Sequence, residues 1–212
     1  MESCAISVGS GGTSLGALAT TTSPTSELNH IDRVYGGSNN YKESAIRHFV
    51  NTDTGWGPLT KFDMYPSAPI DIFIFQDGFG EDFLNAVGEV YVPCATNHAY
   101  EIPGGDKIRQ SYEVLDKFYL PSHNEIFGTT TNSPSDGTII FPYYAEATDA
   151  DRIKYAGGLA TAWWTRSANR WYANRVECVD LNGKRVTKNA NITAGIAVAC
   201  TIVGGQHDKY SE

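Results

Sequence analysis

The feature that most constrains the fold is a series of short strand-like segments in the C-terminal part of the chain. From Ala160 onward the sequence reads ATAWWTR, RVECVDL, KRVTK and GIAVACTIV, with polar or glycine-containing stretches between the segments. β-branched and aromatic residues in short runs of this kind are typical of strands. Asn182-Gly183 lies between the second and third segments, and this dipeptide predicts a type I′ hairpin turn. The series therefore predicts an antiparallel sheet.

The pattern within the segments predicts how they are buried. Val176 and Cys178 alternate with Arg175 and Glu177, which indicates one buried and one solvated face. The last segment, 196–203, is apolar on both faces and predicts a single central strand.

Short helices are predicted before this sheet. Residues 41–51 (YKESAIRHFVN) form an amphipathic helical pattern, and residues 81–87 form a second, shorter one. Ser122 and Glu125 have the spacing of a capping box, so a helical turn follows the strand-like stretch 117–120. Further strands are predicted at 70–75 and 89–92, and 129–140 is predicted to be a surface loop. Two short helices followed by a C-terminal antiparallel sheet indicate an α+β fold.

Length and composition indicate one domain that is preceded by a flexible N-terminal segment. The chain has 212 residues, of which 41% are hydrophobic, enough for one well-buried core. Residues 6–27 consist mainly of Gly, Ser, Thr and Ala. We therefore expect residues 1–34 to be a flexible arm or an assembly segment, and residues 35–212 to be the folded domain.

Charge and hydropathy exclude some partners. A formal charge of −8 would repel a phosphate backbone, so nucleic acid is not expected as a partner. The chain contains no apolar run long enough for a membrane helix, and its first residues lack the pattern of a signal peptide. We expect no membrane insertion.

Cysteine and histidine placement does not favour catalysis. The four cysteines, Cys4, Cys94, Cys178 and Cys200, are too widely spread for a zinc motif, so free buried thiols are favoured. A Cys178–Cys200 disulfide is the alternative if the protein meets an oxidising environment. No H-E-x-x-H or G-x-S-x-G motif surrounds a histidine, and His123 lies beside the capping Glu125, which favours structural use of this cluster. No catalytic residue, metal or cofactor is expected.

Six collinear blocks carry a family resemblance: KESAIRHFVNT, GFGEDFLNAVGEV, KFYLPSHNEIFG, DRIKY, WWTRS and GIAVACTIV. Over about residues 35–203 the chain resembles a family of uncharacterised domains of gut bacteria and their phages. Departures from the family pattern occur at Phe49-Val50, Thr165 and Val198. The order of WWTRS, hairpin and GIAVAC is similar to the end of C-type-lectin-like domains, such as formylglycine-generating enzymes and the variable proteins of diversity-generating retroelements.

This resemblance implies a constant scaffold whose last strands and loops present variable side chains to a ligand. Trp and Tyr supply rigid contact area, and Asn supplies hydrogen-bond donors and acceptors together. Trp163 and Trp164 face opposite sides of a strand, so at least one belongs to the core, and Arg166 is expected to tie the last strands together. The expected ligand-binding residues are Asn169, Arg170, Trp171, Tyr172, Asn174, Arg175, Glu177, Asn189 and Asn191.

The function expected from the resemblance is non-enzymatic recognition, in a tail-fibre or head-fibre protein of a phage virion or in a protein of the bacterial cell surface. Its partners would be a host-surface protein or glycan and other virion proteins, with a homotrimer expected by analogy. One alternative is a structural virion decoration protein. The other is a formylglycine-generating-type oxidase, suggested by Cys178 and Cys200, although their apolar surroundings would raise thiol pKa values.

Overall fold

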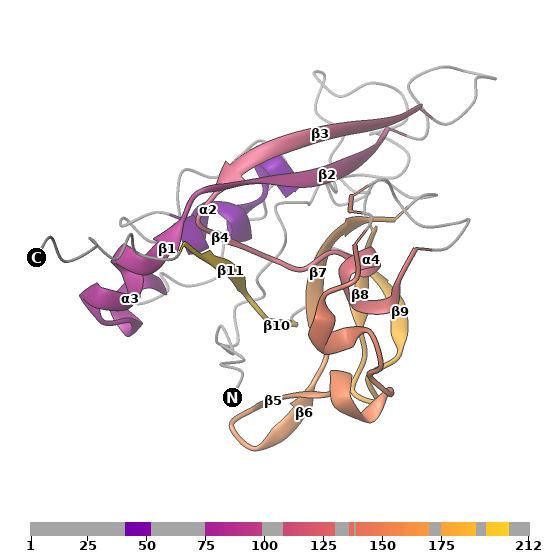
Figure 1. Ribbon diagram of the computed structural model, residues 1–212. Helices are drawn as coiled ribbons and strands as arrows, with labels where there is room; N and C mark the ends of the chain where they lie inside the picture. Colours follow the sequence, from indigo (N-terminus) through magenta and orange to yellow (C-terminus); the bar gives the residue numbers. More distant parts are fainter. Residues whose placement is uncertain are drawn as a thin grey trace, which may run out of the picture.

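The computed structural model describes residues 41–51, 75–98, 108–129, 136–137, 139–169, 175–189 and 194–203 (Figure 1). The helical elements are η1 (Tyr41–Glu43), α2 (Ala45–Asn51), η2 (Phe75–Gly78), α3 (Glu81–Ala86), α4 (His123–Phe127), η3 (Pro142–Tyr144) and η4 (Ala150–Arg152), where η denotes a 3-10 turn. The strands are β1 (Val87–Gly88), β2 (Val90–His98), β3 (Ile108–Asp116), β4 (Phe118–Tyr119), β5 (Lys154–Ala156), β6 (Leu159–Thr161), β7 (Trp163–Ala168), β8 (Arg175–Val179), β9 (Arg185–Asn189), β10 (Gly195–Ile196) and β11 (Ala199–Ile202).

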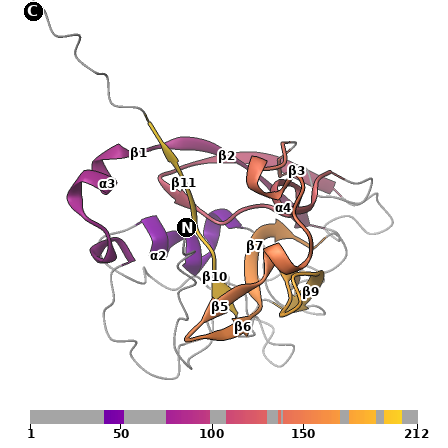
Figure 2. The ribbon, with the colours of Figure 1, turned by 60° about the horizontal axis from the view of Figure 1, so that its bottom comes forward.

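The strands of the described residues form small sheets. The largest has the order β10-β7-β8-β9, and a three-stranded sheet has the order β1-β11-β4. β2 and β3 form a long two-stranded ribbon, which crosses one side of the molecule, while the β5–β6 hairpin projects on the other side (Figures 1 and 2). Every pairing is antiparallel except that of β10 with β7. The α+β prediction is confirmed, with strands outnumbering helices, and the C-terminal sheet is antiparallel apart from β10.

Helix α2 is the C-terminal part of the amphipathic helix predicted at 41–51, since the α-helix begins at Ala45 and Tyr41–Glu43 form the 3-10 turn η1. Its apolar residues Ile46, Phe49 and Val50 are fully buried. Asn51, its last residue, joins the helix to β4: the side-chain Nδ2 donates to the carbonyl of Phe118 at 2.7 Å, and Oδ1 accepts from the amide of Phe118 at 3.0 Å. Because the amide group satisfies both backbone groups of one strand residue, it sets the position of β4 against α2.

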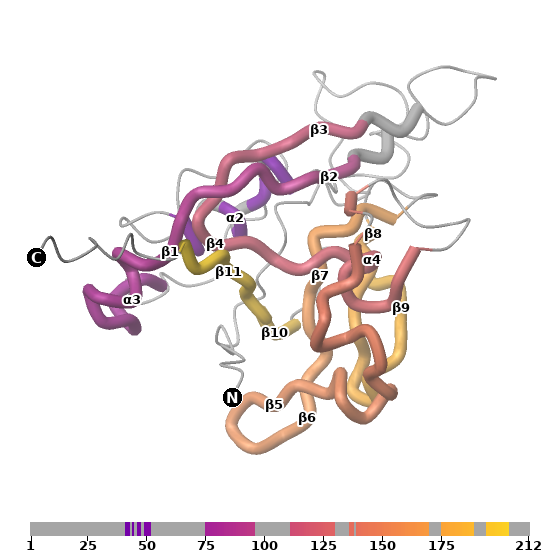
Figure 3. Tube along the Cα trace, viewed as in Figure 1, coloured from indigo at the N-terminus to yellow at the C-terminus, as the bar shows by residue number. Residues whose placement is uncertain are grey.

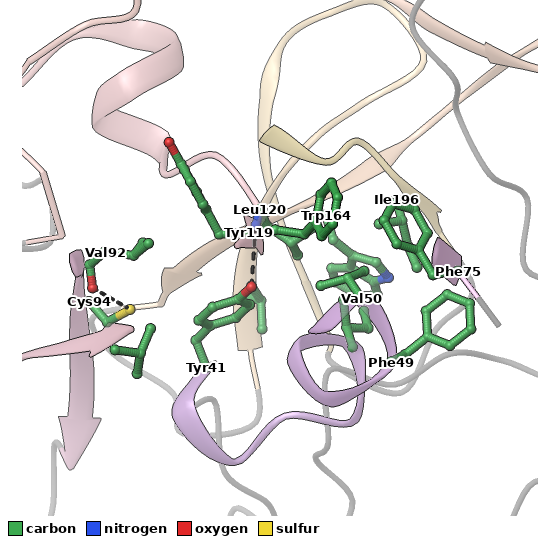
Figure 4. Close-up of a cluster of buried hydrophobic side chains, with 14 of the residues drawn as sticks. Tyr41, Phe49, Val50, Phe75, Val92, Cys94, Tyr119, Leu120, Trp164 and Ile196 are labelled. Atoms are coloured by element: carbon green, nitrogen blue, oxygen red, sulfur yellow. Dashed lines mark hydrogen bonds between the residues drawn. The ribbon is translucent and has the colours of Figure 1, made fainter. Parts of the chain in front are cut away.

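The core has two parts, on opposite sides of the β7 strand. Trp164 packs in the larger part with α2 and β10, and Trp163 packs in the smaller part with Ile126 and Val179. Figure 4 shows the larger part, in which the Tyr41 hydroxyl accepts a hydrogen bond from the amide of Leu120 at 3.3 Å. Both tryptophans are completely buried, so the prediction that at least one belongs to the core is confirmed.

The early strand and helix predictions hold only in part. Helix α3 begins at Glu81 as predicted but ends at Ala86, because the backbone becomes extended at Val87 and pairs with β11. Of the predicted strand 70–75, only Phe75 lies in the described residues, and it belongs to the 3-10 turn η2. The strand predicted at 89–92 continues to residue 98, because β3 pairs with it over its whole length.

The apolar run 196–203 is not the single central strand that its composition predicts. Its first residue ends β10, which lies parallel to β7, while 199–202 form β11, the middle strand of another sheet. Figures 1 and 3 show the chain passing from one sheet to the other at this point. Ile202 and Val203 are about half exposed, at 55% and 48%. The prediction is wrong because a run that is apolar on both faces has no periodicity to mark where the chain changes sheets.

The turn between β8 and β9 differs from the predicted type I′ turn. Gly183 has a φ of 77°, but no described non-glycine residue, Asn182 included, has a positive φ. The Gly183 amide donates to the Asp180 carbonyl at 3.1 Å, and the Asp180 amide donates to the Lys184 carbonyl at 2.8 Å. This is the pattern of a type I turn followed by a glycine bulge. The Asp180 carboxylate favours it by accepting from the amides of Asn182 and Lys184, at 2.9 and 2.8 Å.

The face of β8 that was predicted to be solvated is buried. Glu177 is only 3% exposed, and every residue of β8 after Arg175 is buried. The alternating pattern separates an apolar face from a polar one, but it does not reveal that Ile126 of α4 packs with Val179 on the polar face. The capping box that starts α4 is confirmed: Ser122 Oγ accepts from the Glu125 amide at 3.1 Å, and Glu125 Oε2 accepts from the Ser122 amide at 2.8 Å.

Candidate functional site

Three strand ends meet at one end of the β7-β8-β9 sheet, which is called the sheet edge below. The register pairs Ala168 with Val176 and Arg175 with Asn189, so the end of β7, the start of β8 and the end of β9 are neighbours. The amide of Asn169 donates to the carbonyl of Arg175 at 3.0 Å and closes this edge. The sheet therefore brings together Asn169, Arg175 and Asn189, which the sequence predicted as binding residues from three separate segments.

The remaining predicted binding residues, apart from Glu177, lie outside the described residues. Arg170, Trp171, Tyr172 and Asn174 belong to the segment that joins β7 to β8, and Asn191 belongs to the one that joins β9 to β10. Both segments start from the sheet edge where Asn169 and Asn189 stand. The binding role of these residues stays a prediction.

Two of the predicted binding residues lie below the surface. Asn169 and Glu177 are 5% and 3% exposed, and the Asn169 Nδ2 donates to Glu177 Oε1 at 2.9 Å. Glu177 Oε2 also accepts from Arg185 Nε at 3.1 Å, and Thr187 Oγ1 lies 3.3 Å from both carboxylate oxygens. This carboxylate joins all three strands through side chains. Because both carboxylate oxygens of Glu177 already accept hydrogen bonds from protein donors, Glu177 is suited to hold the strand ends in place from beneath.

A second buried network is centred on Arg166, which is 1% exposed. Its guanidinium makes a two-pronged ion pair with Glu125, with Nη1–Oε2 and Nη2–Oε1 distances of 2.6 Å. It also donates to the carbonyls of Pro93, Leu120 and Asp136 at 2.9, 2.8 and 2.8 Å. Burial alone would lower the pKa of Arg166, but the hydrogen bonds and charge of Glu125 raise it above its ordinary value. Arg166 was predicted to tie the last strands together through fixed hydrogen bonds. The structural role is confirmed, but the partners of the guanidinium belong to β2, to α4 and to the segments at Leu120 and Asp136, so the predicted partners are wrong.

Asp136 belongs to the same network, although the sequence placed it in a surface loop. It is completely buried, its carboxylate accepts from the Ser167 hydroxyl, and its Oδ1 accepts from Asn124 Nδ2 at 3.1 Å. Burial raises the pKa of Asp136 to about 6, although Arg166 and Ser167 act in the opposite direction. Gly137 follows with a φ of 141°, and a Cβ there would lie 3.2 Å from Ser122 Oγ. The only signal in the sequence was this Asp-Gly pair, which marks a turn but says nothing about burial.

His123 is buried between these two networks. Its backbone amide donates to Ser167 Oγ at 2.7 Å, and its ring stacks on Phe127 with 4.9 Å between centroids. Neither ring nitrogen has a hydrogen-bond partner among the described residues. Burial lowers the pKa of His123 to about 4, and the charge of Arg185 lowers it further, whereas Glu177 opposes this. The imidazole is therefore neutral at neutral pH. Because Ser167 donates to Asp136 and not to this ring, the arrangement lacks the base–hydroxyl contact of an activated serine.

The described cysteines are free thiols in apolar surroundings. Cys94 and Cys178 are buried and Cys200 is half-buried, and no bridge joins Cys178 to Cys200. Burial raises the pKa of Cys94 to about 12 and raises those of Cys178 and Cys200 as well. Because a thiolate is the reactive and copper-binding form, these thiols are poorly suited to redox chemistry in the folded state.

Within the described ranges, no group of three or more His, Cys, Asp or Glu side chains is arranged to hold a metal ion. No helix in the described part of the chain is long and apolar enough to cross a membrane.

Comparison with known proteins gives one match. A family described as "Domain of unknown function (DUF6273)" matches residues 19–204. The match begins within the stretch 1–34 that the composition assigned to an arm, and it includes all the networks described above. No curated protein and no solved structure matches the chain.

Proposed function

The chain belongs to the DUF6273 family, and we propose that its domain is a non-enzymatic recognition module which presents one edge of the β7-β8-β9 sheet to a ligand. The observation that carries this proposal is that three strand ends, at Ala168, Arg175 and Asn189, meet above a buried hydrogen-bond network. Segments 170–174 and 190–193 both start from this edge.

The buried network around Glu177 gives an energetic argument for the proposal. Glu177, with its bonds to Asn169, Arg185 and Thr187, holds the three strands in one arrangement. A binding surface that is held by a rigid network loses less conformational entropy when the ligand binds. Trp171 and Tyr172 would supply the rigid contact area, and the asparagines would supply hydrogen bonds.

The setting that we propose is the surface of a phage virion, of the tail-fibre or head-fibre type, or a bacterial cell surface. The finer architecture would be C-type-lectin-like, with a host-surface protein or glycan as ligand. Several copies on one particle, such as a homotrimer, would multiply a modest affinity at each site. The buried network beneath the strand ends and the polar and aromatic residues of segment 170–174 support this proposal.

One observation favours a second candidate, a structural decoration protein of a virion. Within the described residues, the nine-residue strands β2 and β3 pair only with each other, and Tyr91 and Leu115, opposite each other on this ribbon, are 70% and 45% exposed. A strand edge with exposed apolar side chains is a place where another chain can pair. The sheet-edge proposal explains more of the buried polar residues, so we prefer it. The oxidase alternative has no support from the raised thiol pKa values of Cys178 and Cys200.

Binding measurements test the preferred function. Fluorescently labelled full-length protein would be applied to fixed cells of a panel of gut bacteria and to arrays of their surface polysaccharides. We expect the double variant Trp171→Ala/Tyr172→Ala to lose at least about tenfold in affinity. The control variant Tyr155→Ala removes a tyrosine that is 56% exposed on the β5–β6 hairpin, and it should bind as the unaltered protein does.

Two outcomes would contradict the proposal. Equal binding by the double variant and the unaltered protein would remove the role of the sheet edge. Absence of binding to every cell and polysaccharide, with tight binding to purified virions that lack the protein, would favour decoration. Copper titration with thiol labelling of native protein tests the oxidase alternative, which requires that Cys178 and Cys200 react.

A further inference from the structure

A shallow depression lies at the opposite end of the β7-β8-β9 sheet. It occupies about 450 Å³ and is lined by Pro142, Tyr143, Ala145, Glu146, Ala147 and Asp151. The turn between β8 and β9 is adjacent, since a Cβ on Gly183 would touch the carbonyl of Asp149. Segment 170–174 leaves from the other end of the same strands, so the depression is separate from the proposed recognition edge.

The walls of the depression are held in place by the chain itself. The Thr148 amide and hydroxyl donate to Asp151 Oδ2 at 2.8 and 2.6 Å, and the Asp151 amide donates to the Thr148 carbonyl at 3.2 Å. Tyr144 is buried beneath, where it packs with Trp163. Because these contacts are made within the chain, binding in the depression would require little reordering.

Tyr143 is the aromatic wall, and its ring is largely open to solvent, with 68% of the residue exposed. The ammonium of Lys154 lies over this ring, 5.7 Å from its centroid, and it also lies over the rings of Tyr144 and Trp163. The favourable electrostatic position for a cation on this cluster is therefore already filled. Lys154 occupies the position over these rings that a second cation would need, so the exposed surface of Tyr143 is left for the C–H groups of a neutral ligand.

The polar side of the depression consists of hydrogen-bond acceptors. Asp151 has a pKa below its ordinary value because Thr148 donates two hydrogen bonds to it, so it is ionised at neutral pH. Both bonds go to Oδ2, and no hydrogen bond to Oδ1 is found within the described residues. Glu146 is exposed beside it. Carboxylates repel anions and accept strong hydrogen bonds from hydroxyl groups.

We propose that this depression binds a neutral saccharide, with an apolar face of the sugar ring on Tyr143 and sugar hydroxyls donating to Asp151 and Glu146. An open aromatic ring beside carboxylate acceptors, with a lysine already over the ring, distinguishes this ligand from both anionic sugars and ammonium compounds. The inference does not depend on the recognition role of the sheet edge.

Titration calorimetry and NMR on the full chain test it, with neutral mono- and disaccharides as probes and with N-acetylneuraminic acid and tetramethylammonium for comparison. We expect at least one neutral saccharide to bind and neither charged probe to do so. Tyr143→Ala should weaken saccharide binding at least about tenfold. Tyr143→Phe, which keeps the ring, should bind nearly as well, and Tyr155→Ala provides the matched control.

The failures of the two proposals are distinguishable. Binding of no neutral saccharide, preference for tetramethylammonium, or unchanged binding by Tyr143→Ala would each overturn the saccharide site. Loss of saccharide binding in Trp171→Ala/Tyr172→Ala, with none in Tyr143→Ala, would move the saccharide to the sheet edge and overturn this inference alone. Tyr143 is largely exposed, so its replacement should leave the melting temperature unchanged and exclude misfolding as the cause.

Discussion

Replacement of Arg166 by methionine is the most severe test of the buried network. All five N–H groups of the guanidinium are engaged: two on Glu125 and one each on the carbonyls of Pro93, Leu120 and Asp136. Methionine fills similar space but donates nothing. The variant therefore removes the Arg166 donors from the buried Glu125 carboxylate and from three backbone carbonyls.

The expected loss follows from the burial of both partners. The side chains of Arg166 and Glu125 are 0% and 9% exposed, so solvent replaces few of the lost bonds. Breaking such a buried pair on one side destabilises a protein by about 3–5 kcal/mol. A domain is typically stable by about 5–15 kcal/mol, so Arg166→Met should leave the protein marginally folded. The free energy of unfolding, measured by urea titration with tryptophan fluorescence, checks this value.

Two further variants separate charge from packing. Glu125→Gln in the Arg166→Met background removes the unpaired buried charge while keeping a capping-box residue, so it should recover part of the lost stability. Asp149→Asn breaks the Arg152–Asp149 pair, whose aspartate side chain is 51% exposed, and should change stability by less than about 1 kcal/mol. A loss below about 1 kcal/mol for Arg166→Met, or a further loss in the double variant, would refute the reasoning.

Further measurements address the turn, the α2–β4 contact and the buried histidine. Gly183→Ala should destabilise the protein by at least about 2 kcal/mol in urea titration, because φ is +77° and the new Cβ would collide with the carbonyl of Asp149; a loss under about 0.5 kcal/mol would refute this. Asn51→Ala should cost about 1–3 kcal/mol and lower the melting temperature, since it removes both bonds to Phe118; an unchanged melting temperature would contradict it. The folded pKa of His123, about 4, lies below its ordinary value of 6.5, so its contribution to stability is full above pH 6.5 and is lost as the pH falls toward 4. Between these pH values the unaltered protein should lose about 3 kcal/mol relative to His123→Gln, and parallel pH profiles of the two proteins would contradict the assignment.

Local patterns in the sequence predicted those parts of the molecule whose cause is also local. The capping box of Ser122 and Glu125 and the amphipathic helix depend on residues a few positions apart. The capping box is confirmed, and the helix predicted at 41–51 is confirmed from Ala45 onward. Adjacent tryptophans on a strand must face opposite ways, so Trp163 and Trp164 could be assigned to structure before their neighbours were known. The structural role of Arg166 was also predicted, but its partners were not, because Pro93, Glu125 and Asp136 are distant in the sequence.

The remaining features depend on which elements pack together. Glu177 belongs to a polar alternation that predicts solvent exposure, but Ile126 of α4 packs with Val179 on that face. The Glu177 carboxylate is bonded instead to Asn169, which follows β7, and to Arg185 and Thr187 of β9. Asp136 lies in a turn-forming stretch and is nevertheless completely buried, because Arg166 and Ser167 come from a distant strand to meet it. The division of 196–203 between two sheets has the same origin, since partner strands and not side-chain pattern decide where a strand ends. Sequence periodicity reports the faces of an element, whereas burial and hydrogen-bond partners are long-range properties, and only the tertiary structure decides them.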